Sequence, residues 1–154
     1  MNTLEVNLNN EHAGTLSIDT KEDLYEFSYN DTWKSSGYPI SPYLPFDKEI
    51  PSGAIKRFLE NLLPEGKGLD DLTAFTHISK HNIYALIKAI GFETSGALNF
   101  EDSDSRVTPE FRPISEEELA ARIDEIERKS IILWDQKQRL SLSGVQEKLP
   151  VMLK

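Results

Sequence analysis

Residues 3–29 read TLEVNLNNEHAGTLSIDTKEDLYEFSY, and this stretch decides the fold of the N-terminal part of the chain. Apolar and polar residues alternate from Leu4 to Leu8 and again from Leu16 to Ile18, which is the period of a strand with one buried face. A third run over residues 24–29 is rich in aromatic side chains, which favour strands. Residues 9–12 between the first two runs suit a hairpin turn. We therefore predict a small antiparallel meander over residues 3–29.

The segment after the meander changes from strand patterns to helix patterns. Three prolines in residues 39–45 exclude a regular helix or a central strand there. A helix is expected to begin by capping at Pro51-Ser52 and to carry an apolar stripe up to Leu63, and a shorter helix is expected over residues 69–75. Residues 83–90 repeat apolar side chains at helical spacing, and Gly91 supplies the residue that ends that helix.

Shorter elements complete an expected α+β fold, a small N-terminal antiparallel sheet with packed helices. Residues 96–100 are expected to form a strand that returns to the meander. The polar run over residues 101–105 is expected to be a boundary or a surface loop. Ser115 and Glu118 have the spacing of a capping box, so we expect a helix whose apolar face comprises Leu119, Ile123 and Ile126.

Composition limits the class of protein. The 154 residues carry 26 acidic and 17 basic side chains, and the resulting net charge of −9 argues against direct binding to nucleic acid. The chain contains no cysteine, which excludes disulfides, thiolate metal sites and a thiol nucleophile. It has neither an apolar run of membrane-spanning length nor the features of a signal peptide, so we expect a soluble cytoplasmic protein.

Two groups of polar residues have spacings that metal or acid–base chemistry uses. His77 and His81 lie four residues apart, which on one helix would let both ligate a metal, but Asn82 is expected to begin a new helix directly after them. Asp70-Asp71 and the acidic residues 116–118 fall in the first turns of expected helices, where carboxylates complement the helix dipole. We therefore expect these groups to have structural roles, and we expect no metal site.

The strongest candidate for binding chemistry lies at residues 140–151, which read LSLSGVQEKLPV. Strand-like residues 139–142 and 149–153 flank a turn of small side chains, which would let backbone N–H groups approach nucleotide phosphates. Lys148 would add positive charge nearby. The pattern lacks the glycines of a P-loop, and a plain β-hairpin would explain the same residues.

Four stretches resemble motifs of the HipA-type serine/threonine kinases, the toxins of hip toxin–antitoxin modules. Residues 140–151 resemble the family segment SxxGxQEK, and residues 58–66 (FLENLLPEG) resemble FFxNLLPEG. Residues 39–45 (PISPYLP) resemble PLSxSLPL, and residues 90–98 (IGFETSGAL) resemble IGxDxxGAL. The four stretches occur in the family's order, so the chain is identified as a member of this family, with Ser143 where the family often has alanine.

The resemblance implies a division of the chain and a set of functional residues. Residues 1–105 would form the HipA N-terminal subdomain, and residues 106–154 a linker helix and the truncated start of the kinase-like domain, with its first strands and phosphate loop. Ser141 matches the serine that is autophosphorylated in the family. The nucleotide-phosphate loop would comprise Ser143, Gly144, Val145, Gln146, Glu147 and Lys148. The catalytic and metal-binding aspartates are expected beyond Lys154, so none is expected in this chain.

Two functions are compatible with this resemblance. The first is the N-terminal part of a toxin kinase that phosphorylates Ser or Thr of a translation component, such as an aminoacyl-tRNA synthetase, with ATP and Mg²⁺ bound by the complete enzyme. Its implied partners are a HipB-like DNA-binding antitoxin and the remainder of the kinase domain. The second is a stand-alone, non-catalytic module that binds and restrains a partner kinase. The phosphate loop favours the first function, and the chain alone is expected to be inactive and to bind no cofactor.

Overall fold

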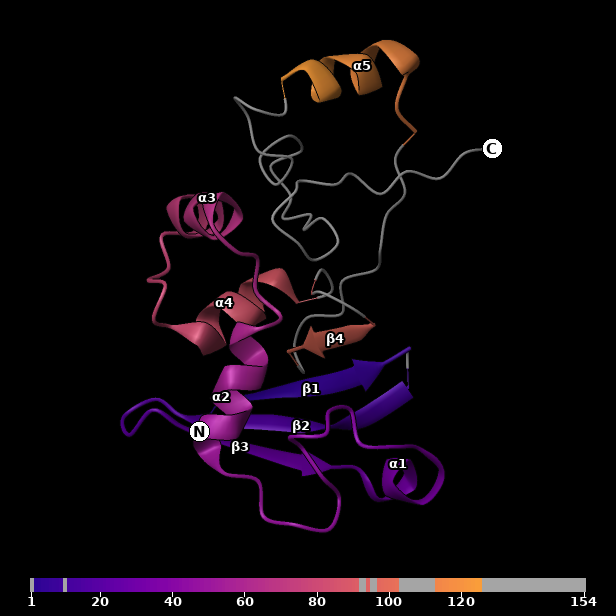
Figure 1. The fold of residues 1–154 in the computed structure, drawn as a ribbon, viewed down its shortest axis with the longest axis vertical. Helices are drawn as coiled ribbons and strands as arrows, with labels where there is room; N and C mark the ends of the chain where they lie inside the picture. Colours follow the sequence, from indigo (N-terminus) through magenta and orange to yellow (C-terminus); the bar gives the residue numbers. More distant parts are fainter. Residues whose placement is uncertain (1, 10, 92–93, 95–96, 103–112, 126–154) are drawn as a thin grey trace.

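A four-stranded antiparallel sheet forms the centre of the fold, in the order β3-β2-β1-β4 (Figure 1). The computed structural model describes residues 2–9, 11–91, 94, 97–102 and 113–125. The strands are β1 (Asn2–Leu8), β2 (Glu11–Asp19), β3 (Leu24–Tyr29) and β4 (Leu98–Glu101). The predicted meander is therefore confirmed, and the predicted returning strand pairs with β1. Glu101, expected in a loop, is the last residue of β4.

The inward face of the sheet carries the alternating apolar residues of the sequence pattern. Its buried side chains include Leu4, Val6, Leu16, Ile18, Tyr25 and Phe100. Helix α2 (Ser52–Glu60) runs across the strands and contacts β3, and α4 (Ile83–Ile90) contacts both α2 and β4 (Figure 1). Each fully buried apolar side chain contributes roughly 1.5–3 kcal/mol, so this contact between helices and sheet is the main source of stability.

A β-bulge interrupts the pairing of β1 with β2. The register passes from Val6 opposite Gly14 to Asn7 opposite His12, which leaves Ala13 as an extra residue on β2. Because side chains alternate between the two faces of a strand, the extra residue moves His12 from the inward to the outward face. The hairpin turn is also shorter than expected, since His12 lies within β2 rather than in the turn.

Helix α2 begins at Ser52 as predicted, but its predicted cap is wrong. Pro51 occupies the N-cap position without a side-chain hydrogen bond. The Ser52 hydroxyl instead accepts a hydrogen bond from the backbone N–H of Tyr25, at 2.9 Å, and so ties α2 to β3. The helix is shorter than the predicted stripe, whose last members, Leu62 and Leu63, are buried in the turn that follows it.

The remaining helices agree with the sequence to different degrees. Helix α1 (Asp31–Ser36) is absent from the sequence prediction, and α3 (Lys67–Thr76) is longer than residues 69–75. The predicted helix over residues 83–90 matches α4, and Gly91 ends it with a positive φ of 45°. The segment with three prolines contains neither helix nor strand, as predicted.

Helix α5 (Glu116–Asp124) is capped by Ser115, whose hydroxyl accepts a hydrogen bond from the Glu118 N–H at 3.1 Å. The predicted apolar face is wrong, because Ile123 is 60% exposed and the buried residue is Arg122. The Arg122 guanidinium donates to the Glu118 carboxylate at 2.6 Å. Ile126 and the strands predicted over residues 139–142 and 149–153 lie outside the described residues.

We expect Gly14→Ala to lower the free energy of unfolding by about 1–3 kcal/mol. A Cβ at Gly14 would lie 2.4 Å from the Ser28 carbonyl oxygen, which cannot move without distorting β3. Gly53→Ala is the matched control, because Gly53 lies inside α2 and its Cβ would meet only the Arg57 side chain, at 3.6 Å. The control is expected to gain up to about 1 kcal/mol from helix propensity. Chemical denaturation measures both variants, and equal stabilities would contradict the close contact at Gly14.

A second expectation concerns alkaline pH. Burial, reinforced by Asp23, raises the pKa of Tyr25 to about 12. The unfolded chain loses this phenolic proton near pH 10, so between these values the native state holds more protons and stability falls as the pH rises. Tyr25→Phe is expected to flatten that fall. Denaturation midpoints at pH 9, 10 and 11 measure it, and an identical decline in both proteins would contradict it.

Candidate functional site

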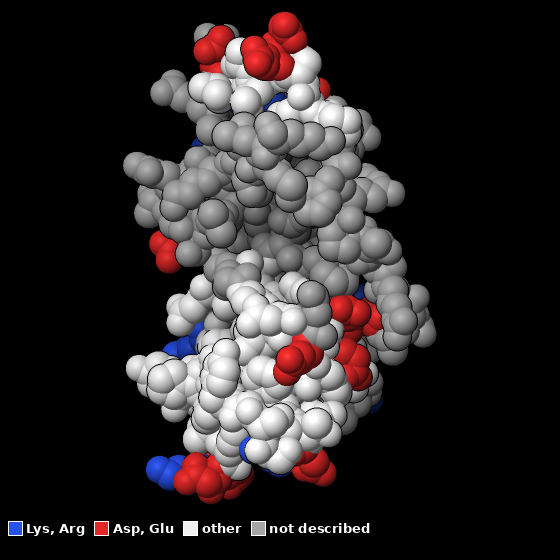
Figure 2. All heavy atoms as spheres, turned by 90° about the vertical axis from the view of Figure 1, so that its right-hand side faces the viewer, with Lys and Arg blue, Asp and Glu red and all other residues white. Residues whose placement is uncertain are grey.

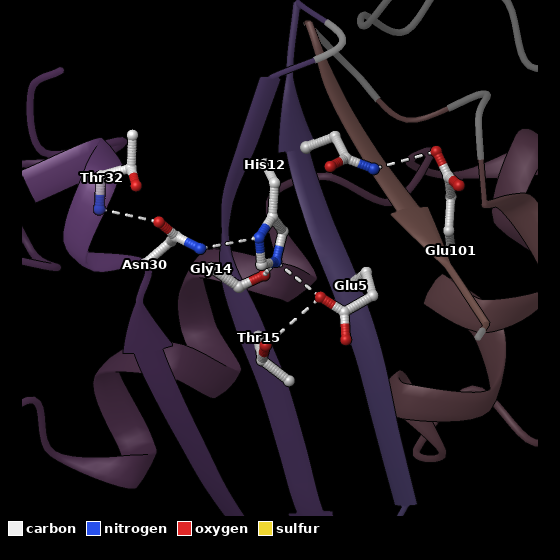
Figure 3. Close-up of polar contacts among 8 residues, drawn as sticks. Glu5, His12, Gly14, Thr15, Asn30, Thr32 and Glu101 are labelled. Atoms are coloured by element: carbon white, nitrogen blue, oxygen red, sulfur yellow. Dashed lines mark hydrogen bonds and ion pairs between the residues drawn. The ribbon is translucent and has the colours of Figure 1, made fainter. Parts of the chain in front are cut away.

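The outward face of the sheet carries two neighbouring groups of hydrogen-bonded polar side chains, together called the outer-face cluster below (Figure 3). Its members come from three adjacent strands: Glu5 and Asn7 from β1, His12 and Thr15 from β2, and Glu101 from β4. The Asn7 amide donates to the Glu101 carboxylate at 2.9 Å, and the Thr15 hydroxyl donates to Glu5 at 3.4 Å. The cluster thus connects the three strands through their side chains.

His12 is the centre of the outer-face cluster, and the bulge at Ala13 places its side chain on the outward face. Its Nε2 lies 2.5 Å from the Glu5 carboxylate and 3.0 Å from the Gly14 carbonyl oxygen. Both partners accept hydrogen bonds, so Nε2 carries a proton. The side chains of His12 and Glu5 are 40% and 41% exposed, so solvent reaches this pair.

Asn30 determines the state of the other ring nitrogen of His12 (Figure 3). Its Oδ1 accepts a hydrogen bond from the Thr32 backbone N–H at 2.8 Å, which caps α1. A backbone N–H can only donate, so the amide nitrogen of Asn30 must face His12, where it lies 3.0 Å from Nδ1. His12 is therefore the neutral tautomer with its proton on Nε2. With both ring nitrogens engaged, His12 acts as a positioning group.

The loop after α1, residues 37–46, is a second feature of interest, and a buried tyrosine holds its centre. The Tyr29 hydroxyl donates to the Leu44 carbonyl oxygen at 2.6 Å and accepts from the Ile40 backbone N–H at 2.9 Å. Burial raises the pKa of Tyr29, which keeps the hydroxyl protonated as a donor. One side chain thus satisfies two backbone groups that proline-rich sequence leaves without a regular partner.

A tryptophan holds the start of the same loop. The buried indole of Trp33 donates from Nε1 to the Tyr38 carbonyl oxygen at 2.9 Å, and the two rings lie 5.7 Å apart. Tyr43, which lies between the anchored residues Ile40 and Leu44, is 76% exposed. An anchored loop therefore presents an aromatic side chain to solvent, an arrangement typical of contact surfaces.

The carboxylates predicted to be structural have that role in α5. Glu116, Glu117 and Glu118 fill its first turn, and a hydrogen bond from its own backbone N–H, helped by Ser115, lowers the pKa of Glu117. Figure 2 shows red carboxylate side chains over α5 and over the sheet-bearing part, with fewer blue cations. Within the described ranges, no three His, Cys, Asp or Glu residues are placed to hold a metal ion. No helix there is long and apolar enough to cross a membrane.

Comparison with known proteins identifies the region that contains these features. Residues 4–101 match the family model described as the HipA N-terminal domain. The chain belongs to the HipA N-terminal domain family. This confirms the resemblance stated from the four motifs.

Relatives of this HipA-family chain are longer than the chain itself. The serine/threonine-protein kinase toxin HipA of Shewanella oneidensis is 44% identical over 149 residues, which cover 96% of this chain and 34% of that protein. A solved complex of S. oneidensis HipA, HipB and operator DNA matches with a TM-score of 0.75 and 42% identity, over 95% of this chain and 34% of the matched chain. The chain therefore spans about a third of the length of the relatives it matches.

The residues predicted from sequence meet different outcomes in this HipA-family fold. Ser141 and the loop from Ser143 to Lys148 lie outside the described residues. His77 ends α3 in the left-handed conformation (φ 57°), so His77 and His81 do not share a helix face. As predicted, Asn82 begins the next helix, its side chain accepting from the backbone of α4.

The sequence analysis missed His12 and Asn30 as candidate functional residues. The position of His12 depends on the bulge, for which the adjacent Gly14 is the one local signal. Asn30 had a readable signal, because an asparagine followed by Asp31 is typical of a helix N-terminus. That signal would have predicted α1 as well.

We expect Tyr29→Phe to release the proline-rich loop. The change leaves the Leu44 carbonyl and the Ile40 N–H without their partner, so it is expected to cost about 1–3 kcal/mol of unfolding free energy. Amide exchange of residues 38–46 is expected to accelerate in the same variant. Tyr43→Phe, which removes an exposed hydroxyl, is the control and is expected to exchange like the unmodified chain. Unchanged exchange in Tyr29→Phe would show that the loop does not depend on this hydroxyl.

Proposed function

We propose that this chain is the N-terminal part of a HipA-type serine/threonine kinase toxin. The observation that carries the proposal is the 44% identity to a HipA kinase toxin over 96% of the chain. In this proposal residues 1–105 form the accessory subdomain, and residues 106–154 form a linker helix and the first strands of the kinase-like domain. The complete protein uses ATP to phosphorylate Ser or Thr of a translation component, such as an aminoacyl-tRNA synthetase, in the cytoplasm.

The proposed nucleotide contact is the loop from Ser143 to Lys148. Small side chains at Ser143 and Gly144 leave backbone N–H groups accessible to phosphate oxygens, and Lys148 adds positive charge. Mg²⁺ neutralises phosphate charge when it is bound in kinases, and its ligands are expected in the other two-thirds of the relatives' length. Ser141, two residues before the loop, is the proposed autophosphorylation site.

The described part of the chain is proposed to be the accessory, non-catalytic portion. In its outer-face cluster His12 is engaged on both ring nitrogens, and the described residues offer no group of three or more metal ligands. The proposed partners are the remainder of the kinase and a HipB-like antitoxin. The matched complex of HipA with HipB and operator DNA supports the second partner. The anchored loop with its exposed Tyr43 is the described surface best suited to such a contact.

The test of the nucleotide loop uses the complete protein that contains residues 1–154. Ser141→Asp is expected to weaken ATP binding by about tenfold or more, because a carboxylate beside the loop repels the ATP phosphates. Ser143→Ala is the matched control, since it alters a small residue of the loop without adding charge, and is expected to bind like the unmodified protein. Calorimetric titration with ATP and Mg²⁺ measures both, and equal affinities would overturn the assignment of the loop.

A second measurement separates the kinase fragment from the stand-alone module. The 154-residue chain, incubated alone with ATP and Mg²⁺, is expected to transfer no phosphate to protein, whereas the complete protein is expected to do so. If the chain instead bound a separately encoded kinase and inhibited it, the stand-alone module would be the correct function.

A further inference from the structure

We propose that His12 and Asn30 form a proton-controlled cap of helix α1. The Asn30 amide has one acceptor, Oδ1, and the Thr32 N–H occupies it at 2.8 Å. The amide nitrogen donates to His12 Nδ1 at 3.0 Å, so the cap and the neutral imidazole support each other (Figure 3). The backbone of Asn30 is fixed separately, since its N–H donates to the Ala13 carbonyl oxygen at 2.9 Å. The proposed control by a proton therefore acts only through the side-chain amide of Asn30.

A proton added at Nδ1 of His12 makes this arrangement impossible. The ring would then present an N–H to the Asn30 amide NH₂, which places two donors face to face. Asn30 can accept from the charged ring only by turning its amide over, which moves Oδ1 to His12 and the NH₂ to the Thr32 N–H. The Thr32 N–H meets one end of this amide and His12 meets the other, so in either orientation the single oxygen reaches only one of the two donors. Protonation of His12 and capping of α1 therefore exclude each other.

One charged group lies directly against the His12 ring, at the nitrogen that Asn30 does not use. The Glu5 carboxylate lies 2.5 Å from Nε2 and can hold the ring in place in both states. The neighbouring elements carry further charged groups: Glu11 precedes His12 on β2, Glu101 on β4 binds Asn7, which is paired with His12, and α1 carries the Asp31–Lys34 pair, 3.9 Å apart. The carboxylates outnumber the single ammonium. The carboxylates attract a charged His12 ring, whereas loss of the cap opposes its charging. Two such opposing effects are what a switch requires.

The cap controls more than the helix that it begins. Helix α1 has six residues, so it depends on its cap more than a long helix does. It carries Trp33, whose indole holds the Tyr38 carbonyl, and whose own carbonyl accepts the Gly37 N–H at 2.7 Å. Loss of the cap therefore loosens the start of the proline-rich loop that presents Tyr43. A change of pH is transmitted from the sheet face to that loop.

The test is a pH titration of the 154-residue chain followed by ¹H–¹⁵N NMR. Histidine side chains ordinarily change charge between pH 5 and 8, so this range is scanned. The Thr32 amide resonance is expected to move with the same midpoint as the His12 ring signals. Amide exchange at Thr32, corrected for intrinsic rates, is expected to be about fivefold faster in the acid state, which corresponds to the loss of one N-cap.

Asn30→Asp is the matched control, because an aspartate caps helices as well as asparagine does and has two acceptor oxygens. It can accept from Thr32 and from a charged His12 together, so its Thr32 amide is expected to keep the same protection across the range. Two outcomes would overturn the proposal. One is a Thr32 resonance that stays still while His12 titrates in the unmodified chain, and the other is an Asn30→Asp variant with the unmodified pH dependence.

Discussion

The backbone of Gly14 approaches the Ser28 carbonyl so closely that no side chain fits between β2 and β3, and the bulge at Ala13 directly precedes this contact. The two features act at one point of the sheet. Ala13 is fully buried, and its carbonyl oxygen accepts the N–H of Asn30, the residue after β3. The beginning of β2, the end of β3 and the beginning of α1 are therefore held together by backbone contacts, to which the Asn30 side chain adds its own hydrogen bonds.

This contact point sets the position of the segment that follows the sheet, which is helix α1 and the proline-rich loop. Helix α1 follows directly after Asn30, and its Trp33 is buried. A Cβ at Gly37 would lie 2.7 Å from the Trp33 ring, so the chain can leave the helix this closely only at a glycine. The proline-rich loop then begins against the indole and passes over the Tyr29 hydroxyl. In this way aromatic side chains of β3 and α1 order the proline-rich loop, which has no ladder of backbone hydrogen bonds of its own.

Whether a feature of the fold could be predicted from the sequence depends on whether its sequence signal is local. The strands within residues 3–29, helix α4 and the cap at Ser115 were predictable, because periodicity and capping act over a few residues. The acceptor role of Ser52 depends on Tyr25, 27 positions away in the chain. Neither the burial of Arg122 nor the bulge at Ala13 follows from periodicity or capping. The short helix α1 has a readable start at Asn30 but too few residues for a periodic pattern.

The candidate site shows the same division. Ser141 and the residues from Ser143 to Lys148 were singled out through a family resemblance, and they remain predictions because they lie outside the described residues. The outer-face cluster could not be foreseen, since its members come from three strands and meet only once the register is known. His12 in particular changes face through one inserted residue. A pattern with period two cannot report such a change.

The strand order also has a consequence for how the protein is made. β1 is a central strand, yet it precedes the other three strands in the chain, and its Asn7 binds Glu101 of β4, 94 positions away. At translation rates of about 5–20 residues per second, one edge of β1 stays open for roughly 5–20 s before β4 leaves the ribosome. An open strand edge can pair with another chain. The nascent meander therefore passes through an interval in which a free edge must be shielded from its neighbours.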